Sequence, residues 1–174
     1  FATDITARRK ERALNDGVLT AIDRSQAMIE FDLTGKILKA NANFLKTMGY
    51  SEGEVVGKHH SMFVAPGYAQ STEYKDFWAS LRRGDVQAAQ FKRLAKGGRE
   101  VWLEATYNPI FDQNGKPERV IKLATDITEQ VQLLIDRKAR IDNNFTEIDS
   151  NIASLDKAAL SGTSAAAQSS NSVQ

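Results

Sequence analysis

The stretch Met28–Lys39 has the sequence MIEFDLTGKILK and predicts a strand, a tight turn and a second strand. The turn falls on residues 32–35, where aspartate and glycine are both favoured. Glycine tolerates positive φ, and aspartate hydrogen-bonds nearby backbone groups. The globular part of the chain therefore opens with a pair of antiparallel strands.

Helical segments follow this strand pair. Short helices are predicted at Ala42–Met48 and, after a serine that can cap the first turn, at Glu52–Val55. A longer helix is predicted at Ser71–Arg83, and Gly84 is suited to ending it. Its apolar side chains recur at i, i+3, i+4 and i+7, which places one face of the helix against a core; they are Tyr74, Phe77, Trp78 and Leu81.

Three further strands are predicted at residues 89–95, 100–111 and 118–125. Gly-Gly and Asn-Gly pairs lie between them and supply the positive φ angles of tight hairpins. Two strands, several short helices and then three strands predict an α+β fold. We expect one five-stranded antiparallel sheet with the short helices on one face.

A phrase that occurs twice predicts how the chain is divided. Residues 1–6 are FATDIT and residues 123–128 are LATDIT, and charged, helix-prone sequence follows both. A repeat at this distance is a repeat of a whole module. We therefore expect the end of a preceding module at 1–6, a linker helix at 7–24, a complete module at 25–128 and an output helix at 129–174.

The segment after the second phrase predicts a coiled coil. Apolar residues recur at spacings of four and three from Ile127 to Ala159, and Lys138 is the one interruption over four heptads. A seam of this period buries its side chains only against another helix. We expect a parallel homodimer through residues 127–160; docking of the helix on the chain's own sheet is the alternative. The tail from Ser161 is rich in Ala, Ser and Gln and leaves two possibilities open. Either the seam continues with small residues, or the helix becomes less ordered.

Composition argues against several classes of protein. With 23 basic and 22 acidic residues the net charge is +1, so we expect no nucleic-acid partner. There is no cysteine for a disulfide or for a cysteine-based metal site. No apolar run approaches the ~18 residues of a membrane span, so we expect a cytoplasmic segment without membrane contact. Nothing in the sequence forms a nucleophile–base constellation, a phosphate-binding glycine loop or a metal cluster, and we expect no enzyme.

The pattern resembles a PAS domain, and more narrowly the tandem PAS modules of methyl-accepting chemotaxis proteins. The resemblance covers essentially all of residues 25–128. The segments that carry it are Ser25–Asn41, Asn43-Phe44, Gly49-Tyr50, Val56–Lys58, Tyr74–Trp78, Gly98–Pro109 and Asp126–Thr128. In such receptors the PAS output helix leads to a helical hairpin that controls a histidine kinase. The resemblance therefore implies partners in adjacent PAS and chemoreceptor signalling domains.

A PAS core implies a pocket that holds FAD, haem b, a small molecule or nothing. His59 and His60 are the only histidines, and neighbouring residues on a short helix point in different directions, so we expect only one to face inward. Neutral imidazole can bind haem iron or hydrogen-bond a flavin; an ordinary surface or capping histidine is the alternative. Flavin-binding aerotaxis modules place a histidine at the position of His60, which makes it the better candidate. No other metal site is expected.

Three more residues are candidates for contact with a cofactor. Trp78 can stack on a planar ring or simply pack in the core. Asn43 can hydrogen-bond a ligand or cap a helix locally. Tyr107 and Trp102 alternate on one strand and so face opposite sides of the sheet, with one of them lining the pocket. Flavin-binding aerotaxis modules carry an Arg-His-Pro-Asp stretch where this sequence has Val64–Gly67, so a module without cofactor stays open.

The repeated phrase supplies candidate residues for signal transfer. Asp126 and Thr128 lie where the last strand becomes the output helix, and both can accept hydrogen bonds from backbone N–H groups there. Asp4 and Thr6 hold the same positions in the first phrase. The expected function is a sensory PAS module of a chemoreceptor for redox state, oxygen or a small ligand. The alternatives are a cofactor-free dimerisation and relay module, or the PAS sensor of a histidine kinase or cyclase.

Overall fold

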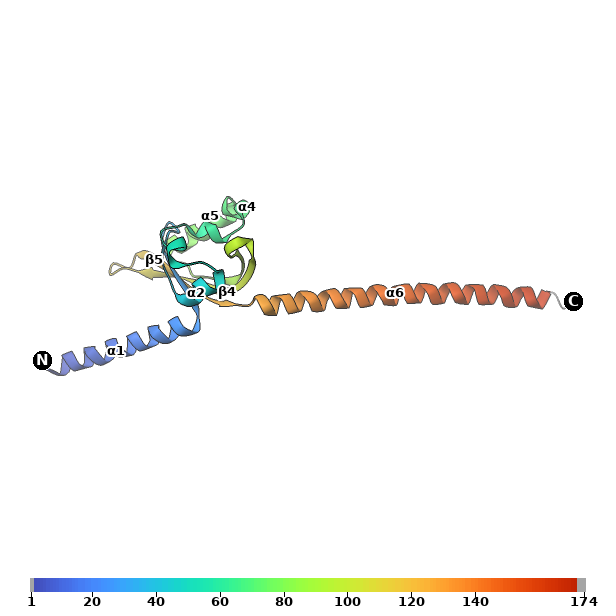
Figure 1. The fold of residues 1–174 in the computed structure, drawn as a ribbon, viewed down its shortest axis with the longest axis horizontal. Coiled ribbons are helices and arrows are strands. Elements are labelled where there is room, and N and C mark those ends of the chain that lie inside the picture. The colour runs from blue at the N-terminus through green and yellow to red at the C-terminus, as the bar shows by residue number, and fades with distance from the viewer. Residues whose placement is uncertain (1, 172–174) are drawn as a thin grey trace. The chain divides into compact units, whose positions relative to one another are not determined.

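The computed structural model describes the backbone of residues 2–171 and the side chains of residues 5–162. Figure 1 shows the strands and short helices that lie, in chain order, after helix α1 and before helix α6. The elements in chain order are α1 Ala2–Ser25, β1 Ala27–Asp32, β2 Ile37–Ala40, α2 Ala42–Met48, α3 Glu52–Val55, the 3-10 helix η1 His60–Phe63, α4 Pro66–Ala69, α5 Thr72–Arg83, β3 Gln87–Leu94, the 3-10 turn η2 Lys96–Gly98, β4 Glu100–Phe111, β5 Pro117–Asp126 and α6 Thr128–Asn171.

The five strands form one antiparallel sheet in the order β2-β1-β5-β4-β3. The first and last strands of the chain are neighbours near the middle of the sheet, and Ala27 pairs with Ala124. The start and the end of the globular part therefore lie side by side. The predicted α+β fold, with one five-stranded antiparallel sheet and several short helices, is confirmed.

Local signals fix the ends of the short helices. The Asn41 side chain accepts the Phe44 N–H at 2.9 Å and begins α2. Ser71 Oγ accepts the Tyr74 N–H at 3.1 Å and begins α5. Gly84 has a φ of +95° and ends α5, as predicted, because a left-handed residue is strained unless it is glycine. The predicted bounds of α2 and α3 match the structure.

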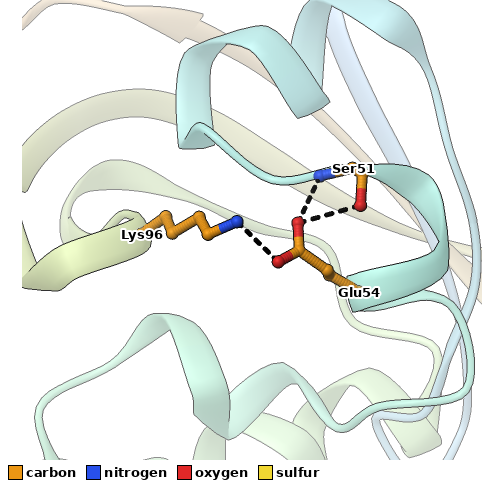
Figure 2. A network of polar contacts seen from close by, with 3 residues as sticks. All are labelled: Ser51, Glu54 and Lys96. Carbon is orange, nitrogen blue, oxygen red and sulfur yellow. Dashed lines mark hydrogen bonds and ion pairs between the residues drawn. The ribbon is translucent and has the colours of Figure 1, made fainter.

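A small polar network joins α3 to the turn between β3 and β4 (Figure 2). Glu54 Oε2 accepts hydrogen bonds from the backbone N and the Oγ of Ser51, both at 2.8 Å. Its other oxygen, Oε1, lies 2.5 Å from Lys96 Nζ. These contacts lower the pKa of Glu54 to about 2, and the hydrogen bond from Lys96 is the largest cause. A one-turn helix, too short to be stable by itself, is thereby tied to the sheet.

Alternation along the strands brings one face of the sheet into the core. In β4 the side chains of Val101, Leu103, Ala105 and Tyr107 are buried, and the intervening residues are exposed or half-buried. Helices α2, α3, α5 and η1 contribute buried side chains to the same core; the largest are Phe44, Met48, Phe63, Tyr74, Trp78 and Leu81. The core therefore sits between the sheet and the short helices.

Two asparagines fasten the end of α1 to this core. Asn41 Nδ2 donates to the carbonyl oxygens of Asp23 and Gln26 at 3.0 and 2.9 Å, and its Oδ1 accepts the Met28 N–H at 2.9 Å. Asn43 Nδ2 donates to the carbonyl oxygens of Asp23 and Arg24 at 3.0 and 3.1 Å. The last carbonyls of a helix have no partner within it, so these side chains complete α1 and fix where it meets the sheet.

The bounds of the two terminal helices differ from those predicted, and the larger difference is at the start of α1. Helix α1 begins at Ala2, so it includes residues 2–6 of the FATDIT phrase instead of following the phrase. Helix α6 begins at Thr128 and continues to Asn171, close to the predicted 129–174, whose last three residues lie outside the described part. Among the described residues, no helix is both long and apolar enough to cross a bilayer.

Candidate functional site

Five elements bring polar side chains together inside the core. We call these residues the core polar cluster: His60 of η1, Tyr74 of α5, Arg93 of β3, Tyr107 of β4 and Lys122 of β5. Each is at most 5% exposed. The three strand residues occupy inward-facing positions of their strands. Buried polar groups need partners, so the contacts within the cluster decide what it can do.

His60 is held between two tyrosines. Its Nδ1 lies 2.9 Å from the Tyr74 hydroxyl, and its Nε2 lies 3.1 Å from the Tyr107 hydroxyl. Burial, followed by the nearby charges of Arg93 and Lys122, lowers the pKa of His60 well below 6.5. The ring is therefore neutral, with one nitrogen donating and the other accepting, and both tyrosine hydroxyls are used.

The Tyr107 hydroxyl is the centre of the cluster. Arg93 Nη2 donates to it at 3.3 Å, and Lys122 Nζ lies 4.9 Å from the centre of the Tyr107 ring. Burial raises the pKa of Tyr107, but Lys122 and Arg93 together outweigh burial, and the pKa is lowered overall. Burial is also the main cause of the lowered pKa of Lys122. Two basic groups thus face a single phenol oxygen.

No carboxylate balances these basic groups within the described part of the chain. Neither Arg93 nor Lys122 belongs to any of its ion pairs. Arg93 Nη1 donates to the Lys92 carbonyl oxygen at 2.9 Å, while the buried Arg93 Nε has no hydrogen-bond partner there. The cluster therefore carries more positive charge and more donors than its own side chains satisfy.

Trp78 packs against the cluster as a core residue. Its ring meets His60 edge-on at 5.4 Å and Phe31 edge-on at 5.7 Å between centroids. Its indole nitrogen is buried without a well-aligned hydrogen bond among the described residues, although it lies near enough to lower the pKa of Tyr74. Burial dominates at Tyr74 and raises that pKa to about 12.

The structure separates two predicted site residues from the cluster. His59 is exposed, with Nε2 2.8 Å from the Thr34 carbonyl oxygen and Nδ1 2.9 Å from Ser61 Oγ. Asn43 holds the carbonyl oxygens at the end of α1, so it neither faces the cluster nor caps its own helix. Tyr107 lies inside the core and Trp102, on the opposite face of β4, is half-buried.

A second polar site lies where β5 becomes α6. Asp126 Oδ1 accepts hydrogen bonds from Thr128 N at 2.9 Å and from Thr128 Oγ1 at 2.6 Å. Thr128 Oγ1 in turn accepts the Trp102 N–H at 3.0 Å, and the Ile127 N–H donates to the Trp102 carbonyl oxygen at 2.9 Å. The first residue of α6 is therefore fixed near the start of β4.

In the first phrase, the residues equivalent to Asp126 and Thr128 lie within a helix. Asp4 and Thr6 belong to α1, which begins before them, so they do not mark a strand-to-helix junction in this chain. The side chain of Asp4 lies outside the described residues. Their role at the end of a preceding module stays a prediction.

The core as folded does not fit a large planar cofactor. Phe31, Phe63 and Tyr107 are each at most 2% exposed, and their rings lie against His60 at 5.3 to 6.2 Å between centroids. Both nitrogens of His60 are already hydrogen-bonded, so ligation of haem iron would require breaking one of these bonds. The described part of the chain has no group of three or more residues able to hold a metal ion.

Sequence reasoning missed Arg93 and Lys122. A signal for them was present, because each lies on the inward side of a strand: Lys122 between Val120 and Ala124, and Arg93 two residues after Phe91. A basic residue within an apolar alternation is unusual, since charged side chains are rarely buried without a partner.

Comparison with known proteins places this fold in a family. A family model described as the PAS fold matches residues 37–124. The biofilm dispersion protein BdlA of Pseudomonas aeruginosa is 43% identical over 132 residues, which are 76% of this chain and 32% of that protein. The aerotaxis receptor of Escherichia coli is 27% identical over 108 residues, which are 62% of this chain and 21% of that receptor. The chain spans less than a third of either relative.

Solved structures agree with the family at the level of the fold. A PAS domain from Colwellia psychrerythraea gives a TM-score of 0.58 at 24% identity, covering 67% of this chain and 98% of that one. An RNA-binding light-oxygen-voltage receptor gives 0.60 at 22% identity, covering 74% of this chain and 38% of that one. The sheet order, the helices on one face and the matched segment lead to one conclusion: the chain belongs to the PAS family and is related to the PAS modules of chemoreceptors.

Proposed function

We propose that this chain is the sensory PAS module of a bacterial chemoreceptor and passes a change in its core to a dimeric output helix. Beyond Gln174 the helix would lead to a domain that controls a kinase. The relationship to BdlA and to the aerotaxis receptor supports this assignment. No step of the proposal requires catalysis by this chain.

The single observation that carries the proposal is the fastening of α6 to β4. Thr128 Oγ1 accepts the Trp102 N–H, and Asp126 holds Thr128 in place. Five residues further along β4, Tyr107 enters the core polar cluster. A displacement of β4 caused in the core would therefore reach the start of α6 through one strand. Packed interfaces tend to switch between discrete arrangements, so a small displacement can be sufficient.

The output helix has the apolar seam that a dimer requires. Six of its residues, each between 45% and 69% exposed in the single chain, recur at spacings of seven, four and three; they are Leu134, Ile141, Phe145, Ile148, Ile152 and Leu155. We infer that a second copy covers this seam. A preceding PAS module would act on the core through α1, whose end is held by Asn41 and Asn43.

The test is replacement of Asp126 in the full-length receptor. Asp126→Ala removes the acceptor of both Thr128 hydrogen bonds, and we expect a folded module that no longer changes kinase activity in response to stimulus. Asp126→Asn keeps an acceptor oxygen and should retain part of the response. Asp76→Ala, on an exposed position of α5, is the matched control. Stimulus-dependent kinase control equal to wild type in Asp126→Ala would refute the proposed transfer route.

The filled core favours one alternative, a module that dimerises and relays without FAD or haem. An absorption spectrum of the purified chain, before and after reduction, distinguishes the two. We expect neither a Soret band nor flavin bands, because side chains occupy the space beside His60 and Trp78. Bands that persist through purification and change on reduction would show that the core opens for a cofactor, whose own chemistry would then supply the signal.

A further inference from the structure

The charge of the core polar cluster is not balanced by the protein. Arg93 and Lys122 are 5% and 2% exposed, and no carboxylate pairs with either in the described part of the chain. A buried charge is costly unless it is paired or neutralised. Lysine can meet this cost by losing its proton, and burial does lower the pKa of Lys122. Arginine cannot, because its guanidinium stays protonated in proteins.

The guanidinium of Arg93 is also short of acceptors. It donates to the Lys92 carbonyl oxygen through Nη1 and to the Tyr107 hydroxyl through Nη2, and its buried Nε has no partner among the described residues. Its carbon lies 4.7 Å from the centre of the Phe91 ring, which attracts the cation but accepts no conventional hydrogen bond. A buried donor of this kind points to an acceptor that the chain does not provide.

Arg93 can be reached from the surface. A hollow of about 460 Å³ opens beside it, between the edge strand β3 and the segment before α5. This size lies within the range of small-molecule sites, about 300 to 1,000 Å³. Its apolar wall includes Val64, Ala65 and Tyr68 in addition to Phe91. At the rim, Glu100 is exposed and paired with Lys92, so it does not neutralise Arg93.

We propose that Arg93, which lines this hollow, binds the carboxylate of a small organic acid there. Lys122 and Tyr107 do not line the hollow and contribute through the core polar cluster, where Tyr107 is hydrogen-bonded to Arg93 and Lys122 lies beside the Tyr107 ring. The planar guanidinium matches a carboxylate, which accepts parallel hydrogen bonds. The apolar and aromatic wall suits the organic part of the ligand. A carboxylate brings one negative charge into the core, whereas a phosphate brings closer to two and is harder to dehydrate. This inference deepens the proposed sensory function and rests on it only for the consequence of binding.

The test is ligand-dependent thermal unfolding of the whole chain at constant ionic strength. Benzoate is the probe, benzamide is its neutral counterpart, and inorganic phosphate tests a different anion. We expect benzoate well above its Kd to raise Tm by ~5 °C or more, because a ligand of the native state stabilises by mass action. Benzamide and phosphate should have little effect.

Two variants test the residues that carry the proposal. Lys122→Met and Arg93→Met each replace the basic group by an uncharged, unbranched side chain, and each should lose the benzoate response. Without ligand, at least Lys122→Met should unfold at a Tm equal to or above that of wild type, because a buried basic group without an acidic partner is removed. Lys39→Met, at an exposed position of β2, is the matched control and should respond as wild type.

Three results would overturn the site. These are an equal Tm rise in wild type and Lys122→Met, an equal effect of benzamide and benzoate, and no effect of benzoate on wild type. A response to phosphate alone would overturn the carboxylate assignment. Binding is measured without any kinase readout, so it is separable from the sensory role. If benzoate binds the chain but does not alter kinase control by the receptor, the site stands and its proposed link to signalling fails.

Discussion

The Tyr107 hydroxyl has more donors around it than any other polar group of the cluster. It contacts His60 Nε2 and accepts from Arg93 Nη2, and the Lys122 ammonium lies beside its ring. A phenol oxygen has two lone pairs and one proton to offer. Its partners come from three other elements, so the loss of this single oxygen would leave several buried groups unsatisfied.

Tyr107→Phe should therefore destabilise the fold more than Tyr74→Phe. The first change leaves Arg93 Nη2 and His60 Nε2 without a partner, and we expect a loss of about 2 to 3 kcal/mol in the free energy of unfolding. The second leaves only His60 Nδ1 and should cost about 1 kcal/mol. Urea unfolding of the two variants and wild type measures both. Equal losses would show that the hydroxyl of Tyr107 is not the centre of the network.

His60 gives the fold a predictable dependence on pH. Its pKa in the folded state lies well below the ordinary 6.5, so the unfolded chain takes up the proton first as pH falls. Stability from this residue is present above about pH 6.5 and is lost below it, with a slope approaching 1.4 kcal/mol per pH unit.

Unfolding free energies measured from pH 7.5 to 5 check this dependence. We expect His60→Gln to flatten the curve while retaining hydrogen-bonding groups for the two tyrosines. The matched change at the exposed neighbour, His59→Gln, should leave the slope in place. A slope that persists in His60→Gln and disappears in His59→Gln would show that His59, and not His60, causes the pH dependence of stability.

At the scale of elements, the short helices are held by side chains from other parts of the chain. The end of α1 depends on Asn41 and Asn43 of the α2 region, and the start of α6 depends on Trp102 of β4. The one-turn helix α3 depends on Lys96 from the turn between β3 and β4 (Figure 2). The linker ends are thus fixed to the same sheet and helices that enclose the core.

The network of α3 can be tested by titrating one carboxyl. Glu54 should titrate with a pKa of about 2 in the folded chain, because Lys96 and Ser51 both hydrogen-bond its charged form. Lys96→Met should raise that pKa toward its ordinary value of 4.5. Because the folded pKa is the lower one, stability from Glu54 is present above pH 4.5 and is lost as pH falls toward 2. Carboxyl NMR shifts followed with pH measure this, and an unchanged pKa in Lys96→Met would contradict it.

At the scale of the whole molecule, the exposed seam of α6 predicts the oligomeric state. Ile141→Asp places a charge where two copies would bury an isoleucine, and we expect the dimer to dissociate at concentrations where wild type remains paired. Asn143→Asp adds the same charge two residues away and off the seam, so it should remain dimeric. Sedimentation velocity of the three proteins measures the change. Dissociation in both variants would point to repulsion between charges and not to the seam.

Much of the fold could be predicted because its signals are local. The bounds of α2, α3 and β4, the end of α5 at Gly84 and the position of the β3–β4 turn depend on caps, glycines and alternation within a few residues. The predicted start of α1 at residue 7 depended on the expectation that the FATDIT phrase ends a preceding module, and the helix begins instead at Ala2.

The sequence by itself determined the PAS fold, the order of its elements and the seam of the last helix. It also narrowed the inward-facing residues to one of His60 and His59 and one of Tyr107 and Trp102. Only the tertiary structure decided that His60 is the buried histidine, that Asn43 serves α1, and that Arg93 and Lys122 meet Tyr107. The reason is distance along the chain: His60 and Tyr107 are 47 residues apart, and no local period links them. Such contacts arise from how the sheet and helices pack, and this packing also determines which charges remain without a partner.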